Sequence, residues 1–211
     1  MGFMPRPAEG PNPGPLETTH APDGGARQQP WALLPLYGAT LFLGAGLLFL
    51  VQPMFAKMVL PLLGGAPAVW NTAMVFFQAC LLAGYVYAHV LTRFMPPAWQ
   101  ALLHLGLLAA AFAALPIAVA SGWTPPAEVA PVPWLIGLMA VSIGLPFFAV
   151  SATAPLLQRW FALSGHAAAK DPYFLYGASN LGSMMALLGY PLLVEPALTL
   201  ARQAWVWTVG Y

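Results

Sequence analysis

The chain has 211 residues, of which 60% are hydrophobic and only 6% are charged, against roughly 25% charged residues in an ordinary soluble domain. This composition predicts an all-α integral membrane protein. The formal net charge is +1, so the chain lacks the basic face that holds nucleic acid, and we expect no nucleic-acid partner. Cys80 is the only cysteine, which excludes an intrachain disulfide and a cysteine-rich metal cage.

The first 30 residues differ in composition from everything that follows. They contain seven prolines and five glycines with scattered charges, and such a segment has too little apolar surface to fold on its own. It also lacks the compact basic start and short apolar core of a signal peptide. We therefore expect a disordered cytoplasmic tail over residues 1–30 and a transmembrane helical domain over residues 31–211.

Five apolar segments are long enough to cross a bilayer, whose core of about 30 Å requires about 20 residues of helix. They are residues 33–55, 69–92, 99–121, 134–158 and 172–194. Tryptophans lie near their edges, where an amphipathic ring prefers the level of the lipid headgroups. A sixth helix begins near Arg202, but too few residues remain before Tyr211 for it to cross. We therefore predict a bundle of five complete transmembrane helices plus the start of a sixth, in a domain that continues past residue 211.

The charges of the loops predict the orientation, because Lys and Arg accumulate on the cytoplasmic side of a membrane. Only Lys57 and Arg202 lie on one side of the predicted bundle. The tail and the alternate loops hold the other five bases, which are Arg6, Arg27, Arg93, Arg159 and Lys170. We expect a location in the bacterial inner membrane with the amino terminus in the cytoplasm.

Residues 52–72 interrupt the apolar run formed by the first two segments. Pro53 and Pro61 each remove a backbone donor, and Gly64 and Gly65 permit a turn that other residues would make only with strain. We therefore expect the first helix to be broken by its prolines.

Polar side chains inside this interruption predict a polar cavity, because a polar group among apolar surface needs a partner. The turn should bring Asn71 close to Lys57, and Gln78 shares a helix face with Asn71 because it lies seven residues later. The candidate cavity residues are Gln52, Lys57, Asn71, Gln78 and Asn180. The alternative is that Lys57 only marks the extracellular interface, as a lysine near a helix end commonly does.

Two further features concern the packing of the predicted helices. Ala178 and Gly182 lie four residues apart in the fifth segment, and small residues at this spacing favour a packing seam over a ligand site. Pro146 and Pro155 predict kinks in the fourth segment, a feature shared by transporters and by inert bundles.

Catalytic and metal-binding motifs are sparse in this sequence. Asp23 and Asp171 lie far apart, so the helices contain no carboxylate pair for acid and base chemistry. His89 and His104 flank the loop around Arg93 and could lie at similar depth, but the spacing favours histidines at the interface over a metal site. We predict no catalytic, cofactor-binding or metal-binding residue, and no cofactor.

Two separated stretches of the sequence resemble a known family, in which they occur in the same order. They are residues 49–65 with 69–72 and 83–85, and residues 171–183 with 189–191 and 195–196. These stretches resemble helices of spermidine-synthase-like membrane proteins, which are described as fused major-facilitator-like and spermidine synthase proteins. In related members the interruption reads Glu, four residues, Arg, three residues, Pro. This chain has Gln52, Lys57 and Pro61 there, so it keeps the polarity but loses the acidic charge.

The resemblance implies a membrane region that precedes a cytoplasmic domain with the fold of S-adenosylmethionine-dependent aminopropyl and methyl transferases. We therefore expect a noncatalytic transmembrane domain that anchors the enzyme and offers a polar cavity for a small cationic metabolite such as a polyamine. The chain alone is expected to have no enzymatic activity. The alternatives are half of a small-molecule transporter or permease, which broken helices near polar residues would suit, and a structural accessory subunit. The expected partners are the lipid bilayer and either such a transferase domain or other membrane subunits.

Overall fold

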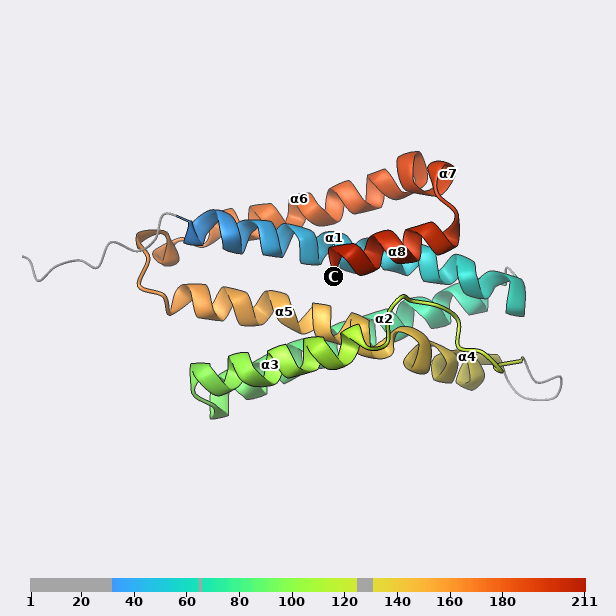
Figure 1. Ribbon diagram of the computed structural model, residues 1–211, viewed down its shortest axis with the longest axis horizontal. Coiled ribbons are helices and arrows are strands. Elements are labelled where there is room, and N and C mark those ends of the chain that lie inside the picture. Colours follow the sequence, from blue (N-terminus) through green and yellow to red (C-terminus); the bar gives the residue numbers. More distant parts are fainter. Residues whose placement is uncertain (1–31, 65, 125–130) are drawn as a thin grey trace, which may run out of the picture. The chain divides into compact units, whose positions relative to one another are not determined.

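The computed structural model describes residues 32–64, 66–124 and 131–211, and these residues form helices joined by turns and loops, with no strand (Figure 1). The predicted all-α class is therefore confirmed for the described part of the chain. Trp31–Tyr211 forms one compact unit. The predicted tail over residues 1–30 lies outside the described residues.

The first helix, α1, is continuous over Leu33–Leu63 and contains both Pro53 and Pro61. The prediction that prolines break this helix was wrong. A proline inside a helix removes one backbone hydrogen bond, and in an apolar bundle neighbouring helices can compensate for that loss. The helix ends instead at Gly64, whose φ of +74° belongs to the region that favours glycine.

The remaining helices follow the predicted segments with one large difference. The third segment was predicted over residues 99–121, but α3 covers only Pro97–Phe112. Residues 113–124 turn and bend without forming a helix, in a stretch that contains Pro116, which has no N–H to donate to a helix. The other elements are α2 (Pro67–Phe94), α4 (Pro131–Met139), the π-helical turn η1 (Ala140–Gly144), α5 (Leu145–Ala162), the 3₁₀ turn η2 (Ala167–Lys170), α6 (Tyr173–Gly189), the π-helical turn η3 (Tyr190–Val194), α7 (Glu195–Ala197) and α8 (Leu200–Gly210).

The fourth segment departs from α-helical geometry at one of its two prolines. The π-helical turn η1 ends two residues before Pro146, whereas Pro155 lies inside α5 without ending it.

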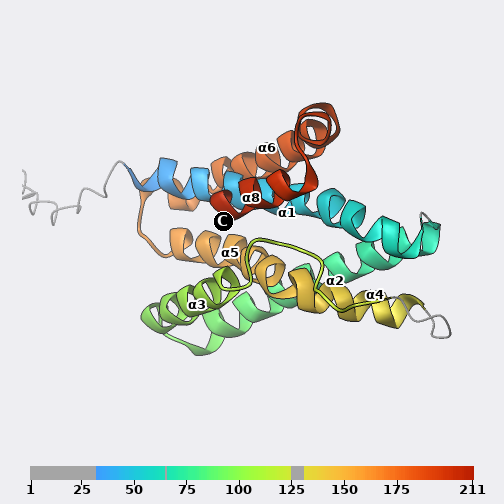
Figure 2. The same cartoon turned by 45° about the vertical axis from the view of Figure 1, so that its right-hand side comes forward.

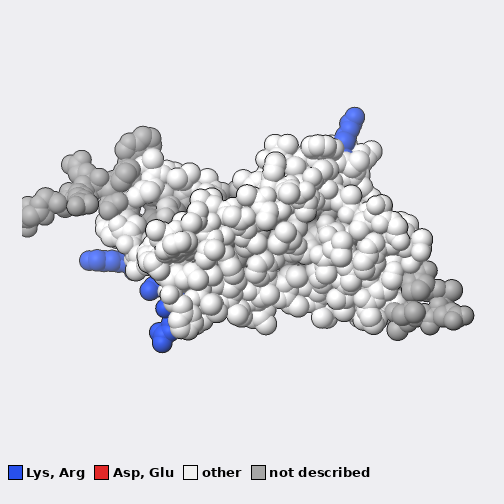
Figure 3. Space-filling model, turned by 60° about the horizontal axis from the view of Figure 1, so that its bottom comes forward, with Lys and Arg blue, Asp and Glu red and all other residues white. Residues whose placement is uncertain are grey.

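Among the described residues, three helices are long and apolar enough to cross a membrane: Leu33–Leu63, Pro67–Phe94 and Pro131–Ala162. The helix α3 is apolar but has only 16 residues, and α6 has 17 before it passes into η3. On the face drawn in Figure 3, Lys and Arg atoms gather mainly at one end of the helical unit, and the surface between the ends is almost free of charge.

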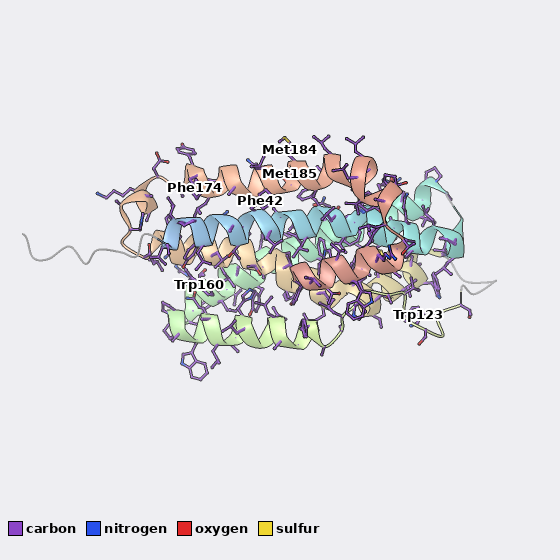
Figure 4. All side chains as sticks on the ribbon, turned by 45° about the horizontal axis from the view of Figure 1, so that its top comes forward. Phe42, Trp123, Trp160, Phe174, Met184 and Met185 are labelled. Atoms are coloured by element: carbon purple, nitrogen blue, oxygen red, sulfur yellow. The ribbon has the colours of Figure 1, made fainter. Side chains whose placement is uncertain are left out.

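The helices α1 and α6 lie side by side and run in the same direction. A Cβ built on Gly182 would collide with the backbone carbonyl of Phe42, and one built on Gly38 would lie 2.7 Å from the ring of Phe174. Figure 4 shows Phe42 and Phe174 along these two helices. The predicted packing seam at Ala178 and Gly182 is therefore confirmed, since small residues allow this close approach.

The helices α2 and α5 form a second close and parallel pair. A Cβ at Gly84 would lie 3.0 Å from the backbone nitrogen of Ala152 and would collide with the Ser151 hydroxyl. Farther along both helices, Ala88 and Leu156 belong to one buried cluster. Both helices therefore end at the same end of the unit.

Hydrogen bonds attach α3 and α8 to these helices. The indole of Trp160 in α5 donates to Gln100 Oε1 in α3 over 2.8 Å, and Trp160 lies between these helices in Figure 4. The indole of Trp207 in α8 donates to the Leu47 carbonyl over 2.9 Å. Figure 2 confirms the placement of α8 beside α1. The 11-residue helix α8 therefore packs along the bundle.

Candidate functional site: a cleft around Lys57 and Glu195

A cleft of about 390 Å³ opens between α1, α2 and the segment from the end of α6 to α7. Most of its wall is apolar or aromatic, with a few polar groups, which is the usual composition of a site for a small molecule. Its lining residues are Phe49, Gln52, Pro53, Lys57, Leu60, Trp70, Met74, Leu187, Tyr190, Pro191 and Glu195.

An ion pair between Lys57 of α1 and Glu195 of α7 lies in this cleft. It is the only ion pair found among the described residues. The two side chains are 37% and 40% exposed, and exposed pairs of this kind contribute about 0.2 to 1 kcal/mol to stability. A charged ligand could therefore replace either partner at little cost to the fold.

Two further polar side chains from opposite walls line the cleft. Gln52 Nε2 donates to the Leu48 carbonyl over 3.0 Å, which leaves its side-chain oxygen as an acceptor. The hydroxyl of Tyr190 is buried and makes no hydrogen bond with another described residue. A buried polar group without a partner is costly, so a ligand or water that reached this hydroxyl would relieve that cost.

Prolines remove two backbone donors from the walls of the cleft. Pro53 has no N–H for the carbonyl of Phe49, and Pro191 has none for the carbonyl of Leu187, because each lies four residues later in the chain. All four residues line the cleft. The helical hydrogen-bond ladder is therefore interrupted on both sides of the cleft.

The five predicted cavity residues separate into two groups. Gln52 and Lys57 line the cleft, whereas the exposed Asn71, Gln78 and Asn180 do not. Trp70 and Met74 present the cleft-facing side of α2. Asn71 follows Trp70 by one residue and so lies about 100° away around the helix, and Gln78 shares the face of Asn71. Asn180 lies seven residues before Leu187, on the same side of α6 but about 10 Å away along its axis.

Glu195 was absent from the predicted cavity although it supplies the acidic charge of the cleft. A signal for it existed in the sequence. Glu195 follows a long apolar stretch, and a carboxylate in such a place needs a partner. Lys57 lies near the end of the first predicted span, and Glu195 follows the fifth. Both ends are expected on the side of the membrane opposite to Arg93 and Arg159. Matching isolated charges by their expected depth would have paired the two residues.

The two histidines weighed as metal ligands do not form a common site with other ligands. His104 is buried, and its Nε2 lies 3.1 Å from the Thr153 hydroxyl. His89 is exposed near the end of α2. Within the described ranges, no group of three or more His, Cys, Asp or Glu side chains could hold a metal ion.

No family model, curated protein or solved structure matches this chain.

Proposed function

We propose that this chain is an integral membrane domain whose cleft binds a small cationic metabolite of the polyamine type. The observation that carries the proposal is the position of Glu195, a carboxylate paired with Lys57 inside a largely apolar cleft. The carboxylate provides the negative charge that Gln52 does not. The proposal also takes support from three helices of sufficient length and apolarity to cross a membrane.

The ligand's ammonium group would compete with Lys57 Nζ for Glu195. Lys57 balances the charge of Glu195, so the two side chains have no net charge without ligand. On binding, the ligand's ammonium would take the place of the Lys57 ammonium beside Glu195. Phe49 and Trp70 line the cleft, and their rings would offer cation–π contacts, each worth about 0.5 to 2 kcal/mol. The side-chain oxygen of Gln52, whose nitrogen already donates to the Leu48 carbonyl, would accept a hydrogen bond from the ligand's N–H groups.

In the membrane, the domain would act as the noncatalytic anchor of a spermidine-synthase-like protein, with its cleft at the end of the helices opposite to a cytoplasmic transferase domain. The charge distribution supports a cytoplasmic amino terminus, because Arg93 and Arg159 both end helices at the end of the unit where α1 begins. The bacterial inner membrane is the location that this proposal assigns.

Binding of spermidine to the purified chain in lipid nanodiscs, measured by calorimetry, tests the proposal. We expect saturable binding that Glu195→Gln weakens about tenfold or more, since a charged hydrogen bond contributes about 1.5 to 3 kcal/mol. Asp171→Asn is the matched control, because Asp171 is the other carboxylate among the described residues and does not line the cleft. Equal weakening by both variants, or no saturable binding to the parent chain, would contradict the proposal.

A transporter half is the second candidate, and η3 is the observation that favours it. This π-helical turn supplies Tyr190 and Pro191 to the cleft, and π-helical turns are frequent at functional sites. Uptake of radiolabelled spermidine into proteoliposomes, with Glu195→Gln as the negative control, separates transport from binding alone.

A further inference from the structure

A second concave site lies at the opposite end of the helices from Lys57. It has a volume of about 540 Å³ and is lined by His89, Thr92 and Arg93 of α2 and by Arg159 of α5. Every lining residue is polar, and three carry nitrogen donors. We propose that this basic pocket binds the phosphate group of an anionic phospholipid.

The parallel packing of α2 and α5 creates the pocket. Close contact at Gly84 and Ser151 fixes the two helices against each other, and the buried Ala88 and Leu156 continue this contact toward the helix ends. Arg93 lies in the last turn of α2, and Arg159 lies in the last turn of α5. Two guanidinium groups that are far apart in the sequence therefore reach one concavity.

No protein carboxylate neutralises these two arginines within the described residues. The carboxylates there are Asp171 and Glu195, and neither forms an ion pair with Arg93 or Arg159, since Glu195 pairs with Lys57. Each helix end contributes about half a negative charge, so two ends together offset only about one of the two positive charges. The pocket keeps an excess of positive charge that an anion would balance.

The donors in the pocket match phosphate better than they match a simple halide ion. A guanidinium group presents a planar fork that fits two phosphate oxygens at once. The ring of the exposed His89 adds a nitrogen donor. The Thr92 hydroxyl donates to the His89 carbonyl over 3.1 Å, so we assign the binding to the two arginines and the histidine.

The surface of α2 beside the pocket distinguishes a lipid phosphate from a free one. Leu82 and Val86 are 64% and 54% exposed, and the spacing of Leu82, Val86, His89 and Arg93 places them on one helix face. An apolar stripe thus leads directly into the basic pocket, as an acyl chain below its headgroup requires. This step rests on the membrane location proposed above, and basic pockets at the cytoplasmic ends of membrane helices are known to hold anionic headgroups.

The test compares the chain in nanodiscs of pure phosphatidylcholine with the chain in nanodiscs of equal parts phosphatidylcholine and phosphatidylglycerol. We expect native mass spectrometry to retain phosphatidylglycerol on the released chain, and the double variant Arg93→Gln, Arg159→Gln to reduce the retained fraction at least fivefold. The matched control is Lys170→Gln, Arg202→Gln, which removes the same charge outside the pocket. Equal loss in both double variants, or no preference for phosphatidylglycerol in the parent chain, overturns the proposal.

Three further measurements separate the possible causes of a negative result. The variant Arg93→Lys, Arg159→Lys keeps the charge without the planar forks, so it should retain less lipid than the parent even if the glutamine variant fails to fold. Stabilisation of the detergent-solubilised chain by inorganic phosphate, equal to that by short-chain phosphatidylglycerol, would assign the pocket to free phosphate and overturn the lipid assignment. Flotation of the chain with pure phosphatidylcholine vesicles tests the membrane location alone. Flotation without phosphatidylglycerol retention contradicts the pocket and leaves the proposed function standing.

Discussion

Gly182 of α6 lies against the backbone of α1 so closely that any side-chain carbon there would collide with the carbonyl oxygen of Phe42. Backbone cannot move aside as the end of a flexible side chain can. The distance between these two helices is therefore set by the absence of a side chain at Gly182, and the contact is a sensitive point for stability.

We predict that Gly182→Ala destabilises the chain, because overpacking of this kind costs about 1 to 3 kcal/mol. The measurement is the midpoint of thermal unfolding in detergent. Gly177→Ala is the control on the same helix, since a Cβ there meets no atom within 4 Å and alanine is the better helix former by about 1 kcal/mol. The contact would lose its importance if Gly182→Ala unfolded at the same temperature as the control or a higher one.

The hydrogen bond from Trp160 to Gln100 should hold α3 on α5. Trp160→Phe leaves the buried Gln100 Oε1 without this donor, and an unsatisfied buried acceptor costs about 1 to 3 kcal/mol. We expect a lower unfolding midpoint and faster proteolysis near the loop between α2 and α3. Trp99→Phe is the matched control, because Trp99 is 57% exposed. Similar loss of stability in both variants would show that loss of the indole itself, and not its hydrogen bond, is responsible.

The ion pair between Lys57 and Glu195 predicts that α1 and α7 can be joined covalently. In a Cys80→Ala background, the double variant Lys57→Cys, Glu195→Cys should be joined by a thiol-specific bifunctional reagent whose spacer replaces the two long side chains, because these side chains meet in the cleft. A mobility shift in non-reducing gels detects the cross-link. Gln78→Cys with Glu195→Cys is the control pair, since Gln78 does not line the cleft, and equal cross-linking of both pairs would argue against a fixed cleft.

The proposed topology places the two ends of the helical unit on opposite sides of the membrane. In the same Cys80→Ala background, Ala66→Cys, in the connection between α1 and α2, should react with an impermeant maleimide added outside intact cells, whereas Ala167→Cys should react only after lysis. Both positions are exposed. The reverse pattern of labelling would invert the orientation.

The sequence predicts the helices better than it predicts their ends. The all-α class, the turn at Gly64 and the seam at Gly182 follow from apolar runs and glycine positions. The break expected at Pro53 and Pro61 does not form, because the cost of a proline depends on what surrounds the helix, and sequence spacing does not contain that information. The early end of α3 is the opposite case, in which the apolar composition concealed the change from helix to loop after Phe112, four residues before Pro116.

Only the part of the candidate site that α1 supplies could be predicted from the sequence. Gln52 and Lys57 stand out locally as polar residues in an apolar segment. The contact with Glu195 depends on how α7 folds back after η3, which involves residues more than a hundred positions away. The orientation of α2 about its own axis decides which of its residues line the cleft, and it places Trp70 toward the cleft and Asn71 away from it.

The pairing of α1 with α6 also imposes an order on biosynthesis. The ribosome produces α1 first, and its main partner follows only after α2, α3 and α5 have been made. In the membrane location proposed above, the face of α1 around Gly38 and Phe42 would be covered during that interval by lipid or by the insertion machinery. A nascent chain stalled before Tyr173 should therefore be the form that membrane quality-control proteases recognise, and completion of α6 should end that exposure.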